Sequence, residues 1–129
     1  MIEDEDGEKF GYYLNTQVVE DYGECIETDN KSFEFNLVSK NNRLKQPMKF
    51  KILDLQIGGY ELFDKLDFNL ITLGDIELRK ENNKNWSFCF QNEYKFDYHG
   101  IENALCGKTC NYPRSQYLTI TRILVIQMN

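Results

Sequence analysis

The sequence is poor in the residues that favour helices. Its 129 residues include a single alanine, Ala104, together with one tryptophan, one histidine and two prolines. Alanine is the strongest helix former, so its scarcity argues against a helical fold. Nine Phe and eight Tyr make the chain rich in aromatic residues instead, and these favour half-buried strands.

The sequence shows no long apolar run and no visible secretory signal. No stretch of about 18 apolar residues occurs, so we expect no membrane insertion. The N-terminus is acidic and lacks the apolar centre of a signal peptide. We therefore expect a cytoplasmic protein whose four cysteines, Cys25, Cys89, Cys106 and Cys110, are reduced thiols.

Charge is unevenly distributed along the chain. The net charge is −6, and acidic residues fill most of the first eight positions. We predict an acidic disordered start over residues 1–8, followed by a single domain over residues 9–129. An acidic chain gains no general attraction to a phosphate backbone, so nucleic-acid binding is not expected.

A two-residue alternation predicts most of the strands. The clearest is Lys31–Val38, where Phe33, Phe35 and Leu37 share one face and Ser32, Glu34 and Asn36 share the other. Pro47 opens the next strand, and the two are expected to pair antiparallel with one face in water. Further strands are predicted at Lys9–Leu14, Gln17–Glu20 and Asp75–Lys80, while Tyr60–Phe63 is ambiguous.

The region from Trp86 to Tyr98 holds a run of alternating aromatic residues. A three-residue turn at Gln91–Glu93 would pair Phe90 with Tyr94, Phe88 with Phe96 and Trp86 with Tyr98. Because strand register follows the buried face, we predict an aromatic hairpin here.

The chain is expected to close with a turn and a strand. His99–Gly107 loses the alternation, residues 108–116 form a loop, and Tyr117–Met128 has apolar residues on both faces. Such a pattern is typical of a central strand covered on both sides. About seven to nine short strands with little helix predict an all-β, two-layer antiparallel sandwich.

Cysteine and histidine could carry chemistry near the C-terminus. Cys106 and Cys110, with His99 and either Cys89 or Cys25, could supply zinc ligands, but the spacing is looser than zinc sites usually show. Cys106 and Cys110 could also form a reversible disulfide near Lys108. We expect ordinary thiols and no metal or cofactor.

An enzyme is the alternative reading of the same region. His99 could act as a base with Cys106 or Glu102, giving a small hydrolase or redox enzyme. Asp75 and Glu102 both lie beside structural breaks, where exposed functional groups tend to occur. A nucleic-acid-binding β domain, with aromatic residues stacking on bases, is a third reading. The plainer interpretation of these aromatics is core packing.

Four segments, taken in order, resemble the TLDc family of oxidation-resistance proteins. Gly7–Tyr13 is similar to its G-x-x-F-G-G-Y strand, and Ser32–Leu37 to its S-F-x-F-S-L strand. Leu73–Leu78 resembles its G-x-D-I/L segment. Asp97–Leu105, together with Ile123–Met128, resembles the closing part of protozoan members.

This resemblance implies a β-sandwich that acts as a protein-interaction module without catalytic residues. It also implies a link to oxidative-stress protection and to the vacuolar proton ATPase as partner. The residues expected at an interaction surface or structural corner are Gly74, Asp75, His99, Gly100, Glu102 and Asn103. The chain starts almost at the first motif, so it is expected to lack the family's first strand and helical segment. Tyr12 replaces a motif glycine. An uncovered sheet edge would invite self-association.

Overall fold

The computed structural model describes residues 1–40, 44–55, 59–108 and 116–128. Within these ranges the chain forms two five-stranded antiparallel sheets, and the only helix is a short 3₁₀ segment, η2 (Glu81–Trp86). The predicted all-β, two-layer sandwich is confirmed. None of the described residues lies in a helix that is long and apolar enough to span a membrane.

The first sheet takes four of its strands from the N-terminal half of the chain and one from near the C-terminus. Its order is β10–β1–β2–β4–β5, and every pair in it is antiparallel. The strands are β1 (Ile2–Asp4), β2 (Lys9–Tyr13), β4 (Phe33–Val38), β5 (Met48–Lys51) and β10 (Ile120–Ile123). The expected pairing of the strand after Pro47 with Lys31–Val38 is confirmed as β4 with β5.

The second sheet combines the short β3 from the N-terminal part with four strands from the middle of the chain, in the order β3–β6–β7–β8–β9. Its strands are β3 (Cys25–Ile26), β6 (Tyr60–Leu62), β7 (Asn69–Leu73), β8 (Ile76–Arg79) and β9 (Phe88–Cys89). β7 and β8 form a hairpin around Gly74, since Leu73 pairs with Ile76 across a two-residue turn, and β8 confirms the strand predicted at Asp75–Lys80. The strand predicted at Gln17–Glu20 is wrong, because no strand forms there.

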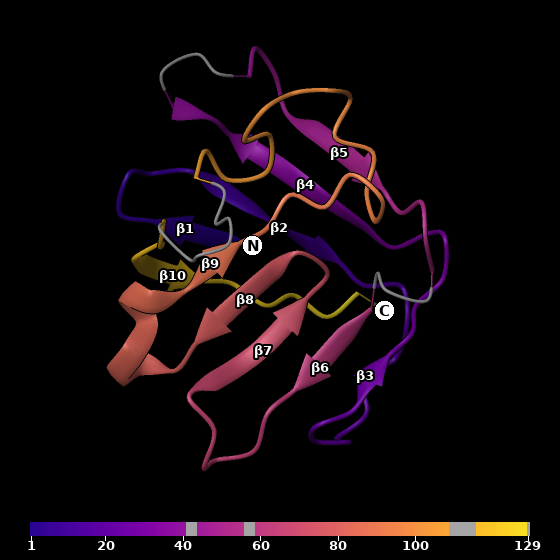
Figure 1. Ribbon diagram of the computed structural model, residues 1–129, viewed down its shortest axis with the longest axis vertical. Helices are drawn as coiled ribbons and strands as arrows, with labels where there is room; N and C mark the ends of the chain where they lie inside the picture. The colour runs from indigo at the N-terminus through magenta and orange to yellow at the C-terminus, as the bar shows by residue number, and fades with distance from the viewer. Residues whose placement is uncertain (41–43, 56–58, 109–115, 129) are drawn as a thin grey trace.

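Both sheets contribute to one core. In Figure 1 the first sheet forms the upper part of the view and the second the lower part, with their strands crossing. The irregular segment after β9 supplies further buried side chains, including Phe96, Tyr98 and Leu105. These pack against Phe10 and Phe50 of the first sheet and Ile76 and Leu78 of the second. The segment therefore fills the space between the layers.

The acidic N-terminus is ordered, so the prediction of a disordered start over residues 1–8 is wrong. Ile2 is only 2% exposed and pairs with Phe10 of β2. Asp4 Oδ1 accepts the backbone N–H groups of Asp6 and Glu8, at 3.0 Å each, which closes the turn into β2. Here carboxylates serve as turn acceptors, a role that counting acidic residues does not reveal.

The predicted aromatic hairpin from Trp86 to Tyr98 is also wrong. Phe88 pairs with Glu77 of β8, whereas Phe96 bridges to Ile52 beyond β5. The two halves of the supposed hairpin therefore join different sheets. Trp86 and Tyr94 are exposed, while Phe88, Phe96 and Tyr98 are buried as core packing requires.

The last strand is shorter than predicted and lies at an edge. β10 ends at Ile123, and in the described part of the chain its only strand partner is β1. Val125 and Ile126 are exposed. The prediction of a central strand over Tyr117–Met128 is wrong because β1, which the sequence pattern did not indicate, occupies the inner position.

Strand β4 alternates as predicted, but its apolar side chains are on the outside. Glu34 and Asn36 are 0% and 1% exposed and face the core. Phe33, Phe35 and Leu37 lie on the other face, where Leu37 is 44% exposed. The face of the β4–β5 pair that meets water is thus the aromatic face of β4. This inversion creates both features described next.

Candidate functional site

The predicted site residues do not gather in one place. Gly74 and Asp75 form the turn between β7 and β8, and Asp75 is buried. His99 and Gly100 form an exposed turn beside β5, and Glu102 is exposed further along. The expectation that Asp75 presents an exposed functional group is wrong.

Asp75 instead joins a buried cluster with Glu34 and Tyr98. Tyr98 Oη lies 2.5 Å from Glu34 Oε2 and 2.6 Å from Asp75 Oδ2. The backbone N–H of Asp75 donates to Glu34 Oε1 at 2.8 Å. The cluster therefore ties β4 of the first sheet to the β7–β8 turn of the second.

Gly74 permits this close approach. Its φ is +55°, a left-handed conformation that non-glycine residues rarely adopt. A Cβ at this position would lie 2.6 Å from Phe96 Cζ and 2.7 Å from Glu34 Oε1. Gly74 is thus a structural corner, because any side chain there would displace Glu34 or Phe96.

The electrostatics of the cluster favour a bound proton. Burial raises the pKa of Glu34 well above its usual range, and the Asp75 carboxylate raises it further. Burial also raises the pKa of Asp75, but hydrogen bonds from Tyr98 and from the Asn92 N–H oppose that rise, as does the charge of Lys95. Lys95 Nζ lies 3.8 Å from Asp75 Oδ1. Of the two carboxyl groups, Asp75 is therefore the one whose ionised form its neighbours favour.

A second polar side chain of β4, that of Asn36, is also buried on the inward face. Asn36 Nδ2 donates to the carbonyl oxygen of Leu105 at 2.8 Å and to Glu8 Oε2 at 3.1 Å. Glu8 Oε1 accepts the Lys40 N–H at 2.8 Å. The amide nitrogen of Asn36 thus has two acceptors, whereas its Oδ1 is buried without a hydrogen-bond partner among the described residues.

His99 contacts the backbone at the edge of β5. Its Nε2 lies 3.3 Å from the Lys49 carbonyl oxygen, and its backbone N–H donates to Asp97 Oδ1 at 3.0 Å. Asp97 N donates to the Lys51 carbonyl oxygen at 2.9 Å. The segment around His99 therefore covers the free edge of β5.

The cysteines are separated from this histidine. Cys106 is 2% exposed, and its Sγ donates to the Lys108 carbonyl oxygen at 3.1 Å. Cys89 is buried beside it, and burial followed by the Cys106 thiol raises the pKa of Cys89. Across the described ranges, no hydrogen bond or ion pair joins His99 to Cys106 or Glu102.

Metal and disulfide chemistry at Cys110 falls outside the described residues. Cys25, Cys89 and Cys106 are free thiols, and Cys25 is exposed. In the part of the chain that the structure describes, no group of three or more His, Cys, Asp or Glu is placed to hold a metal ion. The proposed Cys106–Cys110 pair and its zinc variant therefore stay predictions.

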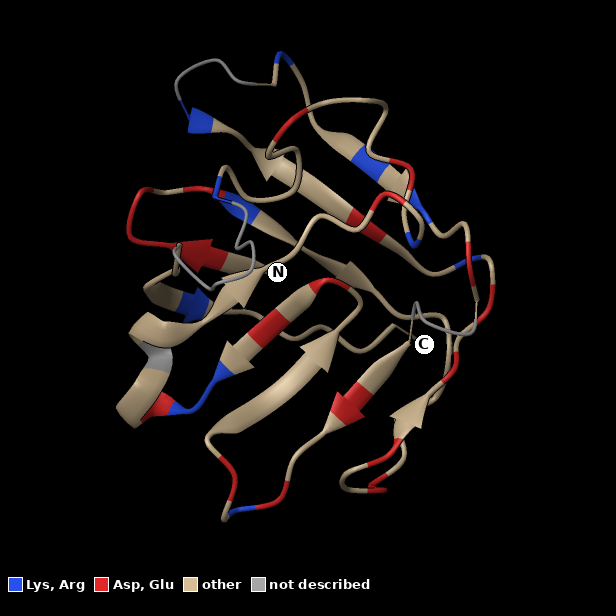
Figure 2. Cartoon of the chain, viewed as in Figure 1, with Lys and Arg blue, Asp and Glu red and all other residues tan. Residues whose placement is uncertain are grey.

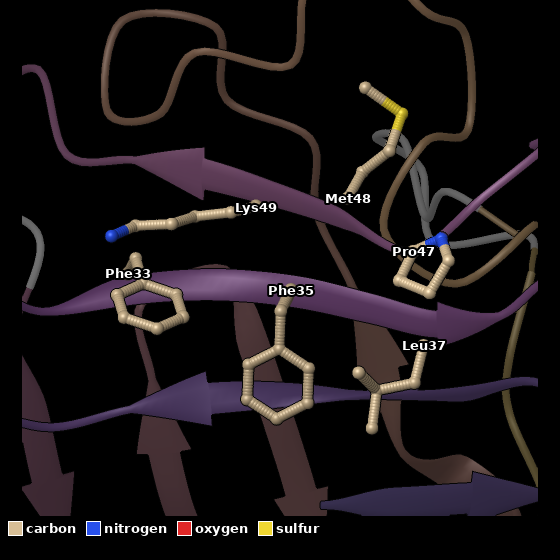
Figure 3. Close-up of a pocket in the computed structure, with 6 residues that line it drawn as sticks. All are labelled: Phe33, Phe35, Leu37, Pro47, Met48 and Lys49. Carbon is tan, nitrogen blue, oxygen red and sulfur yellow. The ribbon is translucent and has the colours of Figure 1, made fainter.

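The outer face of β4 forms an open aromatic groove of about 350 Å³. Figure 3 shows its side chains, which come from β4, from β5 and from the proline just before β5: Phe33, Phe35, Leu37, Pro47, Met48 and Lys49. The Tyr13 ring of β2 stacks on Phe33, with centroids 5.0 Å apart. Lys49 Nζ lies 3.9 Å from the centroid of the Phe33 ring.

The neighbouring glycine leaves room for this aromatic row. A Cβ on Gly11 of β2 would lie 2.8 Å from Phe35 Cζ, so Phe35 lies across the space that Gly11 leaves empty. The alternation of β4 was visible in the sequence, but it does not say which face meets water. The groove and the inward Glu34 were both missed for that reason.

The fold and this face define a β-sandwich with an exposed aromatic surface. No family model, no curated protein and no solved structure matches this chain. The resemblance to the TLDc family therefore stays a prediction that rests on its four motifs.

Proposed function

We propose that this protein is a non-enzymatic protein-interaction module of the TLDc type, and that it binds its partner through the outer face of β2, β4 and β5. The supporting observation is the inverted strand β4, which buries Glu34 and Asn36 and leaves Leu37 exposed. A strand selected only for stability would place its apolar side chains in the core. The outward aromatic row thus has a use outside the core.

The free energy of burial supports this assignment. Full burial of a Phe or Leu side chain is worth about 1.5–3 kcal/mol. On β4 that gain is only partly realised, because Phe33 and Phe35 are half-buried and Leu37 is exposed. A partner that covers the groove recovers the remainder. Aromatic residues are enriched at protein interfaces for this reason.

Charge around the groove indicates the chemistry of the partner. Lys49 and Lys51 both lie exposed on β5, where blue marks lysine in Figure 2. Within the described residues, neither has a carboxylate within 4.0 Å. An apolar protein segment with acidic neighbours would complement this surface.

The partner is expected to bind the outer face of the sheet rather than the edge of β5. The edge of β5 is occupied by Asp97 N and by His99, which bond the carbonyl oxygens of Lys51 and Lys49. An added strand at this edge would have to displace both contacts. The partner segment is therefore expected to lie across the sheet, on the aromatic groove.

The TLDc resemblance suggests a first partner to test, in a cytoplasmic setting linked to oxidative-stress protection. The partner is a peripheral subunit of the vacuolar proton ATPase, presented as a purified protein. Leu37→Ser should weaken its binding at least about tenfold, equivalent to about 1.4 kcal/mol. Surface plasmon resonance on the immobilised chain would measure the change.

Leu70→Ser is the matched control. Leu70 lies on β7 of the other sheet and is 42% exposed, against 44% for Leu37. It should bind like the unchanged protein. Equal affinities for both variants would exclude the β4 face, whereas no binding by the unchanged chain would exclude this ATPase subunit as partner.

A further inference from the structure

With both carboxyl groups ionised, the cluster of Glu34, Tyr98 and Asp75 would contain fewer protons than its contacts require. A phenol hydroxyl has one hydrogen and can donate only one hydrogen bond. Tyr98 Oη nevertheless lies within 2.6 Å of two carboxyl oxygens, one from Glu34 and one from Asp75. Two ionised carboxylates would leave one of these contacts without a hydrogen. A second proton must therefore lie in the cluster.

The surrounding donors say where that proton is. Asp75 Oδ2 already accepts the Asn92 N–H at 2.6 Å, and Lys95 Nζ is 3.8 Å from Oδ1. Asp75 is thus the stabilised anion and accepts the Tyr98 hydrogen. Glu34 Oε1 accepts the Asp75 N–H, which leaves Oε2 to carry the proton and donate it to Tyr98 Oη.

We propose that Glu34, Tyr98 and Asp75 form a proton-loaded latch between the two sheets, which takes up one proton when the chain folds and opens when that proton is lost at alkaline pH. The bonds run in one direction, from Glu34 to Tyr98 to Asp75. On release, the proton passes from Glu34 Oε2 to hydroxide in the solvent. The remaining anions then face one hydroxyl, and the β7–β8 turn loses its hold on β4.

Other titratable groups around the latch do not supply a second cation. Those whose charge acts on the three residues are Lys95 from the segment after β9, Tyr12 from β2, Cys89 from β9 and Cys106. Lys95 is the only cation among them and faces Asp75. Burial raises the pKa of Tyr12 and of Cys89, so both are neutral near pH 7 and would add only negative charge at higher pH. Raising the pH therefore adds only negative charge around the latch, which favours its opening.

The sign of the pH dependence follows from the proton count. Glu34 is ionised in the unfolded chain near neutral pH and protonated in the folded one. Burial raises the folded pKa above the unfolded value, so stability is greatest below the unfolded pKa and is lost as pH rises towards the folded pKa. One bound proton changes the unfolding constant tenfold per pH unit, about 1.4 kcal/mol.

The infrared spectrum of the unchanged protein tests the latch directly. At pH 7 the folded chain should show the C=O band of one protonated carboxylic acid, and Glu34→Gln should lack it. Glu102→Gln, which removes an exposed carboxylate, should retain the band. A folded protein without this band at pH 7 would overturn the proposal.

Urea denaturation between pH 6 and pH 9 gives the thermodynamic test. As the pH rises, the unfolding constant of the unchanged protein should increase by an extra factor of ten per pH unit relative to that of Glu34→Gln. The amide of the variant can donate to Tyr98 and accept from Asp75, so the contacts survive without a titrating proton. Equal slopes in the two proteins would reject the latch. The infrared result on the unchanged chain decides the matter even where the variant does not fold.

Discussion

Strands β4 and β8 have the same alternation in sequence and opposite orientations in the fold. In β8, Ile76 and Leu78 are buried, while Glu77 and Arg79 lie outside and pair at 3.0 Å. In β4 the acidic residue is the buried one and the apolar residues are outside. Period two therefore predicts which residues share a face, but it does not predict which face is inside.

The difference depends on what each strand meets across the core. Opposite β4, Tyr98 and the Asp75 N–H supply two contacts to the Glu34 carboxyl group. The inner side of β8 meets apolar side chains of the common core. A buried carboxyl group is tolerated only where hydrogen-bond partners are already in place, and distant parts of the chain supply those partners to β4.

The largest effect is expected when a leucine is replaced by alanine in each of the two strands. Leu78→Ala in β8 should lower the free energy of unfolding by about 2–5 kcal/mol, because it leaves a cavity at a side chain that is 1% exposed. Leu37→Ala in β4 should cost less than about 1 kcal/mol, since Leu37 already lies in water. Urea denaturation at pH 7 measures both. Similar losses for the two variants would show that the outer face of β4 is covered.

The alternating strands were predictable, and the groups that join them were not. Polar and apolar side chains alternate along the predicted strands at Lys31–Val38, after Pro47 and at Asp75–Lys80. This alternation made the three strands predictable. Ile2–Asp4 escaped because three residues are too short to show a period, and its acidic neighbours suggested a solvated tail. The Glu34 cluster escaped because Glu34, Asp75 and Tyr98 are far apart in sequence.

Gly74 tests how closely the two sheets approach. Gly74→Ala should lower the free energy of unfolding by about 2–4 kcal/mol, since it combines left-handed strain with overlap against Phe96 and Glu34. Gly100→Ala is the matched control: its φ is +70°, but no atom lies within 4 Å of the added Cβ. It should cost only the strain, about 1–2 kcal/mol.

Thermal and urea unfolding of the two glycine variants separate strain from packing. An excess loss for Gly74→Ala is expected, together with a change in the near-ultraviolet signal of Tyr98, because the β7–β8 turn moves away from Glu34. Equal losses for the two variants would mean that the turn moves aside at no cost, and the close packing of the sheets at Glu34 would then be unimportant for stability.

The smallest expected effect concerns the outer face of β4 itself. Lys49→Gln should lower the free energy of unfolding by about 0.5–1 kcal/mol, because it removes the ammonium group that lies 3.9 Å from the Phe33 centroid. Lys51→Gln on the same strand should be close to neutral, since no described ring is in cation–π contact with Lys51. A double-mutant cycle that combines Lys49→Gln with Phe33→Leu isolates the coupling energy between Lys49 and Phe33. The same cycle with Lys51→Gln should give no coupling energy. Coupling energies of the same size for both lysines would indicate a general effect of positive charge. The outer face of β4 would then have no specific ammonium–ring contact for a partner to displace.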